Sequence, residues 1–162
     1  NAIREVKRVD GESLSAGSDA FAASFIFAGQ IGKEKPRLFQ IYSAGNFIEA
    51  TPDTPFFQIG EHKYGKPILD RIIRPYVSLE DAARCALVSL DSTMKSNLTV
   101  GPPLDLAIVP RDALRITHKE RFDLDTPFYA NLKKSWGDLL VRSFMELPRF
   151  DWEQSQSQSN LI

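Results

Sequence analysis

The sequence predicts an α+β fold built around antiparallel sheets. Strand-like patterns come first along the chain, two helical patterns follow, two more strand patterns come next, and a helix ends the folded part. Runs of strands separated from runs of helices favour antiparallel sheets, whereas a parallel sheet needs strands that alternate with helices. A chain of 162 residues suits one domain. We expect that domain over residues 1–152, followed by a polar, disordered tail over residues 153–162.

Four segments in the first part of the chain are predicted as strands. In the first of them, apolar and small residues alternate with a period of two. A tight hairpin is expected after the second, because Gly45 and Asn46 are residue types that adopt the positive φ such a turn needs. The four segments are residues 24–31, 38–42, 47–50 and 56–60.

Prolines and a capping pattern mark the next two helices. Pro67 occupies a first-turn position, and Pro75 ends the helix that begins there. Ser78 is expected to cap the second helix, with Asp81 completing a capping box. The apolar residues of this second helix recur at helical spacing, at Leu79, Ala82, Ala83, Ala86, Leu87 and Leu90.

Two further strands and a last helix complete the prediction. The strands are expected over residues 104–109 and 114–117, on either side of a proline-containing turn. Thr126 and Pro127 read as the cap and first-turn proline of the helix. Its apolar residues are spaced four apart, at Leu132, Trp136, Leu140 and Phe144.

Composition and charge argue against several classes of partner. Twenty basic residues are balanced by 21 acidic ones, for a net charge of -1, so we expect no binding to nucleic acid or to a membrane surface. The basic residues between positions 111 and 121 are interrupted by Asp112 and Glu120, which is typical of a solvated face. No apolar run is long enough to cross a bilayer and no secretory signal is visible, so we expect a cytoplasmic protein.

The single cysteine, Cys85, rules out an internal disulfide and a multi-cysteine zinc site. Together with His62 and His118 it allows a cysteine hydrolase in principle. Cys85 lies on the alanine-rich apolar face, however, where a thiol behaves as a small hydrophobe. The histidines also lack the spacing of metal ligands. We therefore expect a buried structural cysteine, no metal site and no cofactor.

The polar segment Leu90–Gly101 follows the second helix and leads into a strand. Clusters of Asp, Ser and Thr are common at such boundaries, because these side chains bond to nearby backbone groups. On this pattern alone, Asp91 is a solvated acid at the end of a helix.

Three stretches of the chain closely resemble one protein family. They are IYSAGNFIEATPDTPFFQIGE at Ile41–Glu61, YGKPILDR at Tyr64–Arg71 and SLDSTM at Ser89–Met94. Together they resemble the bacterial ancestral-β-subunit (Anbu) family of proteasome-like proteins and, more distantly, the proteasome β subunits. The match extends over Ala23–Val109 and is most specific in the long central stretch.

The resemblance implies the N-terminal-nucleophile hydrolase fold, in which two antiparallel sheets are sandwiched between layers of helices. Proteasome-type members use an N-terminal threonine, whose hydroxyl attacks the amide and whose own amine acts as the base. This is physically reasonable because an α-amine has a pKa of roughly 8. By the same resemblance the chain begins inside the second helix of the fold, is incomplete at its N-terminus and lacks the nucleophile. We therefore expect the chain by itself to be inactive.

The resemblance also assigns roles to four residues of this sequence. Asp91 matches the aspartate that follows the helix, and Ser96 matches the serine just beyond it; both lie near the threonine amine in proteasome-like subunits. Gly60 matches the glycine of the strand end that faces the active site, and Glu61 stands where β subunits usually have a small residue. Asp91 and Ser96 are thus expected to support the catalytic site, and Gly60 and Glu61 to bind substrate.

The implied function is that of a subunit of a proteasome-like threonine hydrolase, which cleaves peptide or amide bonds. We expect self-association into a ring-like or helical oligomer, and a peptide or protein substrate once the N-terminal segment completes the site. One alternative is a noncatalytic structural or assembly subunit, or a truncated gene product, of the same fold. The other is an unrelated α+β binding domain, for which the long central match leaves little room.

Overall fold

The structure is a computed structural model that describes residues 5, 8–9 and 23–153. The chain divides into two compact units, Asn1–Phe122 and Asp123–Ile162. The expected single domain over residues 1–152 stays a prediction. Apart from Glu153, the predicted polar tail lies outside the described residues. No helix in the described part of the chain is long and apolar enough to span a membrane.

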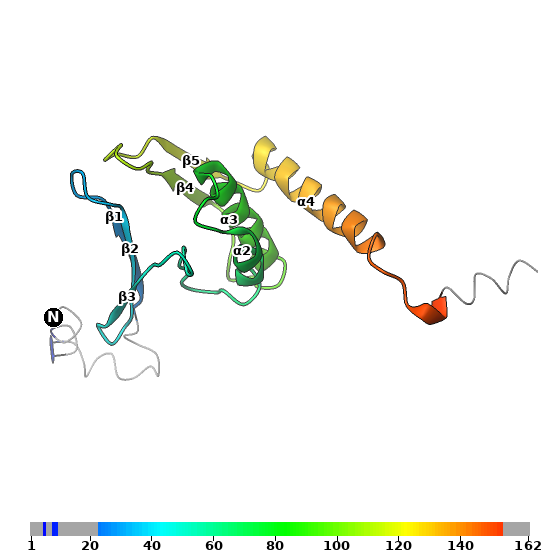
Figure 1. Cartoon of the computed structure of the whole chain (residues 1–162), viewed down its shortest axis with the longest axis horizontal. Coiled ribbons are helices and arrows are strands. Elements are labelled where there is room, and N and C mark those ends of the chain that lie inside the picture. The colour runs from blue at the N-terminus through cyan, green and yellow to red at the C-terminus, as the bar shows by residue number, and fades with distance from the viewer. Residues whose placement is uncertain (1–4, 6–7, 10–22, 154–162) are drawn as a thin grey trace, which may run out of the picture. The chain divides into compact units, whose positions relative to one another are not determined.

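The first unit begins with a three-stranded antiparallel sheet in the order β1-β2-β3 (Figure 1). Its strands are β1 (Phe25–Gly29), β2 (Arg37–Ile41) and β3 (Phe47–Glu49). The predicted hairpin joins β2 to β3, and Gly45 has the positive φ of 89° that its turn requires. Asn46 does not share that conformation; its carbonyl accepts the N–H of Tyr42 at 2.9 Å. The predicted hairpin is thus confirmed, with one residue rather than two in the left-handed region.

The fourth predicted strand, residues 56–60, was wrong. After β3, one isolated bridge joins Thr51 to Thr54, and the segment from Pro55 to Ile59 has no regular secondary structure. Alternating apolar residues predict an extended segment with one apolar and one polar face. A strand also needs a second segment that pairs with its backbone N–H and C=O groups. No described strand pairs with this segment.

Two helices follow, as predicted. They are α2 (Lys66–Ile72), with Pro67 in its first turn, and α3 (Leu79–Met94). The Ser78 hydroxyl oxygen accepts the N–H of Asp81 at 3.0 Å, and the same hydroxyl donates to the Asp81 carboxylate at 2.8 Å. Ser78 is therefore the cap of α3, and Asp81 completes the predicted box through the Ser78 side chain.

The core between α2 and α3 consists of Leu69, Ile73 and Cys85, with partly buried apolar neighbours around them. The predicted apolar face of α3 is confirmed in part, because Leu87 is buried while Leu79 is 45% exposed. Leu79 is the first residue of the helix. The neighbours of this core are Phe56, Ile68 and Ala82.

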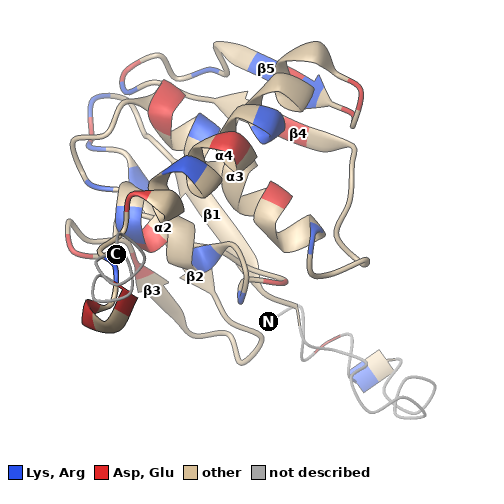
Figure 2. Cartoon of the chain, turned by 90° about the vertical axis from the view of Figure 1, so that its right-hand side faces the viewer, with Lys and Arg blue, Asp and Glu red and all other residues tan. Residues whose placement is uncertain are grey.

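The strands β4 (Leu104–Ile108) and β5 (His118–Phe122) form an antiparallel hairpin. The predicted position of β5, residues 114–117, was wrong, because Asp112 and Leu114 have positive φ angles of 64° and 51° and belong to the connection. Figure 2 shows basic segments on β5 and an acidic segment on β4, and Arg121 of β5 lies 3.5 Å from Asp105 of β4.

Two hydrogen bonds between Gln30 and Asp112 join the turn after β1 to the connection between β4 and β5. Gln30 Nε2 donates to Asp112 Oδ1 at 2.7 Å, and the Asp112 N–H donates to Gln30 Oε1 at 2.7 Å. Both bonds cross 82 positions of sequence.

The α+β class with antiparallel sheets is confirmed.

The second unit contains α4 (Pro127–Met145). Thr126 does not cap it with its side chain; its hydroxyl accepts the N–H of Asp123 at 2.8 Å instead. The predicted start of the helix is therefore confirmed, but the predicted capping bond is wrong. Leu140 and Phe144, expected on the apolar face, are both exposed.

Candidate functional site

Asp91 lies in the last turn of α3. From its match to the family aspartate, we had expected it to follow the helix. Its exposed fraction is 2%, which makes it one of the few buried charged or polar residues of the described chain. Lys95 Nζ lies 3.3 Å from Asp91 Oδ2, while the Lys95 side chain is 61% exposed. The interpretation of Asp91 as a solvated acid is therefore wrong. A buried carboxylate is retained in proteins where it meets a cation or hydrogen-bond donors.

Two other polar residues of α3 are buried on a different face of the helix from Asp91, because residues two positions apart do not share a face. Ser89 and Thr93 are 2% and 0% exposed, and Thr93 Oγ1 donates to the Ser89 carbonyl at 2.9 Å. This bond satisfies the hydroxyl without a partner outside the helix. Sequence reasoning missed this buried polar stripe, because Ser and Thr near a helix end resemble ordinary boundary residues.

Gly65 explains how the stripe is covered. A Cβ atom at this position would lie 2.7 Å from the Ser89 carbonyl oxygen and 2.8 Å from Thr93 Oγ1. The absence of a side chain at Gly65 thus lets the start of α2 pack directly on α3. The glycine before Pro67 in the sequence was a signal for this contact, but it fits a helix start equally well.

Glu61 makes the second contact between this segment and the end of α3. Its Oε1 accepts the N–H of Lys63 at 3.0 Å, and its Oε2 accepts from Asn97 Nδ2 at 3.1 Å. These donors lower the pKa of Glu61, the Lys63 N–H contributing most. Because the pKa is lower in the folded state, this stabilisation is present above the unfolded pKa and is lost as pH falls through the folded pKa. Gly60, exposed and with a φ of 77°, comes directly before it.

Ser96 lies just past α3 and is exposed. Its N–H donates to the Thr93 carbonyl at 3.0 Å, but its hydroxyl makes no hydrogen bond within the described chain. The structure thus places Gly60 and Glu61 beside the end of α3, where Asp91 and Ser96 are found. It does not bring the Ser96 hydroxyl into hydrogen-bond contact with Asp91.

Cys85 does not form a nucleophilic pair. It is 4% exposed, and burial raises the pKa of its thiol, which disfavours the reactive thiolate. His62 Nδ1 donates to the Gly60 carbonyl at 3.1 Å, and His118 Nδ1 lies 3.1 Å from Thr117 Oγ1. Neither histidine activates Cys85. Among the described residues, His, Cys, Asp and Glu side chains form no group of three that could hold a metal ion.

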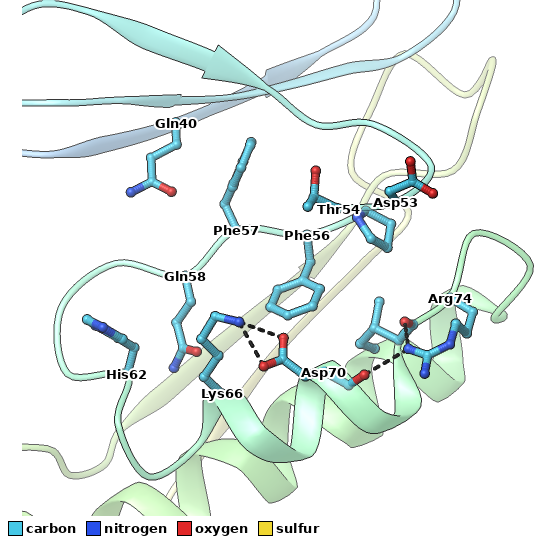
Figure 3. A pocket seen from close by; sticks show the side chains of 12 residues that line it. Gln40, Asp53, Thr54, Phe56, Phe57, Gln58, His62, Lys66, Asp70 and Arg74 are labelled. Atoms are coloured by element: carbon cyan, nitrogen blue, oxygen red, sulfur yellow. Dashed lines mark hydrogen bonds and ion pairs between the residues drawn. The ribbon is translucent and has the colours of Figure 1, made fainter.

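A cavity of about 330 Å³ lies beside the segment that leads to Gly60 (Figure 3). Phe56, His62 and Arg74 line it, and the charges on its floor are paired: Lys66 Nζ donates to both Asp70 oxygens, at 2.6 and 2.8 Å. Arg74 donates to backbone carbonyls of α2. The Lys66 charge is thus paired with Asp70, whereas Arg74 bonds to neutral carbonyls and keeps its positive charge at the cavity.

What this arrangement offers chemically is one buried carboxylate at a helix end, with the Lys95 ammonium 3.3 Å away. A carboxylate in such a setting stabilises a nearby cation and raises the pKa of an amine placed beside it. Among the described residues, Cys85 has no base beside it. The site therefore fits a supporting role for a group that these residues do not supply.

Comparison with known proteins agrees with this geometry. A model of the proteasome subunit family matches residues 4–109. Anbu from Hyphomicrobium sp. strain MC1 is 51% identical, with 93% of this chain and 60% of that chain covered and a TM-score of 0.81. Anbu from Yersinia bercovieri is 46% identical over 92% of this chain and 61% of that chain, with a TM-score of 0.83.

The Anbu complex from Pseudomonas aeruginosa, whose structure is a helical assembly, is 46% identical over 91% of this chain and 61% of that chain, with a TM-score of 0.84. This chain therefore spans about 60% of the length of these relatives. No curated protein matches. The chain belongs to the proteasome subunit family and, within it, to the Anbu or ancestral β-subunit proteins.

Proposed function

We propose that this chain is part of a subunit of a self-assembling, proteasome-like hydrolase that cleaves peptide or amide bonds, and that Asp91 supports its catalytic amine. The observation that carries the proposal is the burial of Asp91, which is 2% exposed at the end of α3. A buried carboxylate is retained where cations or hydrogen-bond donors meet it, and Lys95 Nζ, 3.3 Å from Asp91 Oδ2, is one such cation. An N-terminal threonine amine, the base implied by the family resemblance, is a cation that such a charge would hold in place.

The neighbouring residues support this role. Gly60 and Glu61 lie beside the same end of α3, and we propose that Gly60 faces the substrate. The exposed Ser96 hydroxyl has no partner within the described chain, so it is available to a group brought to this end of the helix. A hydroxyl in that position would add about 1 kcal/mol through one neutral hydrogen bond.

Hydrolysis is the first expected result. The full-length gene product should release the fluorophore from a panel of short fluorogenic peptide amides faster than a buffer blank does. Cys85→Ala should retain the rate within about twofold, because a buried thiol with a raised pKa is no nucleophile. If Cys85→Ala abolished turnover while the protein remained folded, a cysteine mechanism would replace the one proposed.

Self-association is the second expected result. The complex of the Pseudomonas aeruginosa relative forms a helical assembly, and this chain exposes large apolar side chains, as in β1, where Phe25 and Phe27 are exposed. Large exposed apolar patches drive association. Sedimentation velocity on the full-length gene product should give a mass several times that of one subunit. A single monomeric species at micromolar concentration would contradict the proposal.

The two measurements together separate the proposed hydrolase from its alternative. Assembly without turnover would identify a noncatalytic structural subunit, and turnover without assembly would retain the enzyme and remove the oligomer.

A further inference from the structure

The segment that carries Gly60 and the loop after α3 are joined by one side-chain hydrogen bond that spans 36 positions of sequence, from Asn97 Nδ2 to Glu61 Oε2. Both partners are anchored at their other ends. Glu61 Oε1 holds the Lys63 N–H. The Asn97 N–H donates to the Thr93 carbonyl of α3 at 2.9 Å. The bond therefore joins the segment of Glu61 to the loop that follows α3.

The orientation of the Asn97 amide is determined by its surroundings. Its Oδ1 accepts both the N–H and the hydroxyl of Thr99, at 2.8 and 2.7 Å. A rotated amide would present an NH₂ group to these two donors and an oxygen to the Glu61 carboxylate, which can only accept. The Thr99 donors and the Glu61 carboxylate thus both require the observed orientation of the amide. Hydrogen bonds are donated in one direction along this network, from Thr99 to Asn97 and from Asn97 to Glu61.

We propose that Glu61 and Asn97 form a tether that positions the loop Lys95–Val100, and that Glu61 is a positioning residue and not a contact of the substrate. The loop carries Ser96, which has no side-chain bond of its own in the described chain. The Ser96 N–H holds this residue to the Thr93 carbonyl of α3, and the next residue, Asn97, joins the loop to the segment of Glu61. The catalytic part of this inference rests on the proposed function, and the tether itself does not.

Glu61 is suited to this task and poorly suited to substrate binding. Each of its carboxylate oxygens already accepts a hydrogen bond from this chain. The charged groups that act on it, Lys63 and His62, come from its own segment, and the loop opposite presents the neutral Asn97 amide. A substrate amide would have to compete with donors that are already in place, at a loss of hydrogen bonds that are costly to leave unmade.

A reciprocal exchange of the two side chains tests the tether. Asn97→Asp alone places two carboxylates against each other, and Glu61→Gln alone places two NH₂ groups against each other. The double variant, E61Q with N97D, restores every bond: the Gln oxygen accepts the Lys63 N–H, its NH₂ donates to the Asp, and the Asp accepts from Thr99. Asn46→Asp, in the exposed turn before β3, makes the same chemical change away from the tether and serves as the matched control.

Two readouts are measured on the full-length gene product. Hydrogen exchange at residues 95–100 should accelerate roughly tenfold in each single variant and return to within about threefold of wild type in the double variant. The kcat for peptide amides should follow the same pattern while KM changes less than about twofold, because a positioning defect acts on the chemical step. Asn46→Asp should leave both unchanged.

The outcomes distinguish the tether from the proposed function. Normal exchange in both single variants, or no recovery in the double variant, overturns the tether. Altered exchange with unaltered kcat retains the tether and overturns the positioning role of Glu61. A rise in KM with constant kcat in Glu61→Gln would return Glu61 to substrate binding. If the wild-type protein shows no turnover, the proposed function and the positioning role fail, and the exchange data alone decide the tether.

Discussion

Replacing Asp91 by Asn in the full-length gene product is expected to lower turnover roughly ten- to a hundredfold, which corresponds to about 1.4 to 2.7 kcal/mol of activation free energy. The substitution conserves shape and removes the negative charge. In the proposed site that charge holds the threonine amine in the geometry that removes the hydroxyl proton. Because Asp91 is only 2% exposed, solvent does little to weaken its interaction with that cation.

The pH dependence gives a second, independent readout for Asp91→Asn. The amine acts as a base only when it is unprotonated, so the acidic limb of the rate profile reports its pKa. A nearby carboxylate stabilises the protonated amine and raises that pKa; its removal lowers the pKa. The acidic limb should therefore move to lower pH in the variant. A structural defect elsewhere would lower the rate without this displacement.

Glu80→Gln is the matched control, because it removes one carboxylate from the exposed first turn of the same helix. It should change stability by less than about 0.5 kcal/mol and leave the rate profile in place. Melting curves confirm that both variants are folded. Wild-type turnover and an unmoved acidic limb in Asp91→Asn would remove Asp91 from the chemistry and leave its burial without a functional explanation.

Replacing Gly65 by Ala is expected to destabilise the protein by about 2 to 4 kcal/mol, which is large for the addition of one methyl group. The new Cβ would lie 2.7 Å from the Ser89 carbonyl and 2.8 Å from Thr93 Oγ1, distances that force backbone to move. The φ angle of Gly65 is −91°, which alanine adopts without strain, so the cost comes from the contact between α2 and α3 alone. Differential scanning fluorimetry should show a fall in Tm of roughly 5 to 15 °C.

Two further variants localise that cost. Gly29→Ala, whose Cβ would meet nothing within 4 Å, should leave the Tm nearly unchanged. The new Cβ would also meet Ser89 Oγ, and Ser89→Ala in the Gly65→Ala background removes that contact. It should restore only part of the lost stability, because the Ser89 carbonyl belongs to the backbone and stays in place. A Tm for Gly65→Ala within 2 °C of wild type, about 1 kcal/mol or less at this size, would show that the two helices separate easily.

Local signals predicted several element boundaries well. Ser78 and Pro67 act within one turn of the residues they affect, so the starts of α2 and α3 could be found without knowledge of their neighbours. Thr126 shows the limit of such signals, because its hydroxyl accepts the N–H of Asp123, which precedes it, and caps no N–H of the helix. The helix nevertheless begins at Pro127, as predicted.

Strand positions were less predictable, because they depend on a second segment. Residues 56–60 alternate like a strand but have no partner in the described chain. In the β4–β5 hairpin, Leu104 pairs with Phe122, and this register places β5 at His118–Phe122, later than the apolar pattern around Leu114 predicted. Hydrogen-bonded register is a property of two segments, and a one-segment pattern does not contain it.

The candidate site divides in the same way. Family resemblance singled out Asp91, Ser96, Gly60 and Glu61, and the burial of Cys85 followed from its alanine-rich face. Asp91 looked like any acid near a helix end. Its 2% exposure arises from the packing of the end of α3. Sequence reasoning also gave no role to Asn97, whose partner Glu61 lies 36 positions away.

The sequence by itself therefore determined the helix starts and the turn at Gly45, because these depend on residue types within a few positions of one another. It also determined the α+β class, from the order of the elements along the chain, and the family, from three matching stretches. Only the tertiary structure decided the register of β5, the burial of Asp91, the close contact at Gly65 and the bond between Glu61 and Asn97. The physical reason is that exposure, close approach and hydrogen bonding are relations between segments distant in the chain. They exist only after the conformational entropy of the intervening residues has been lost on folding.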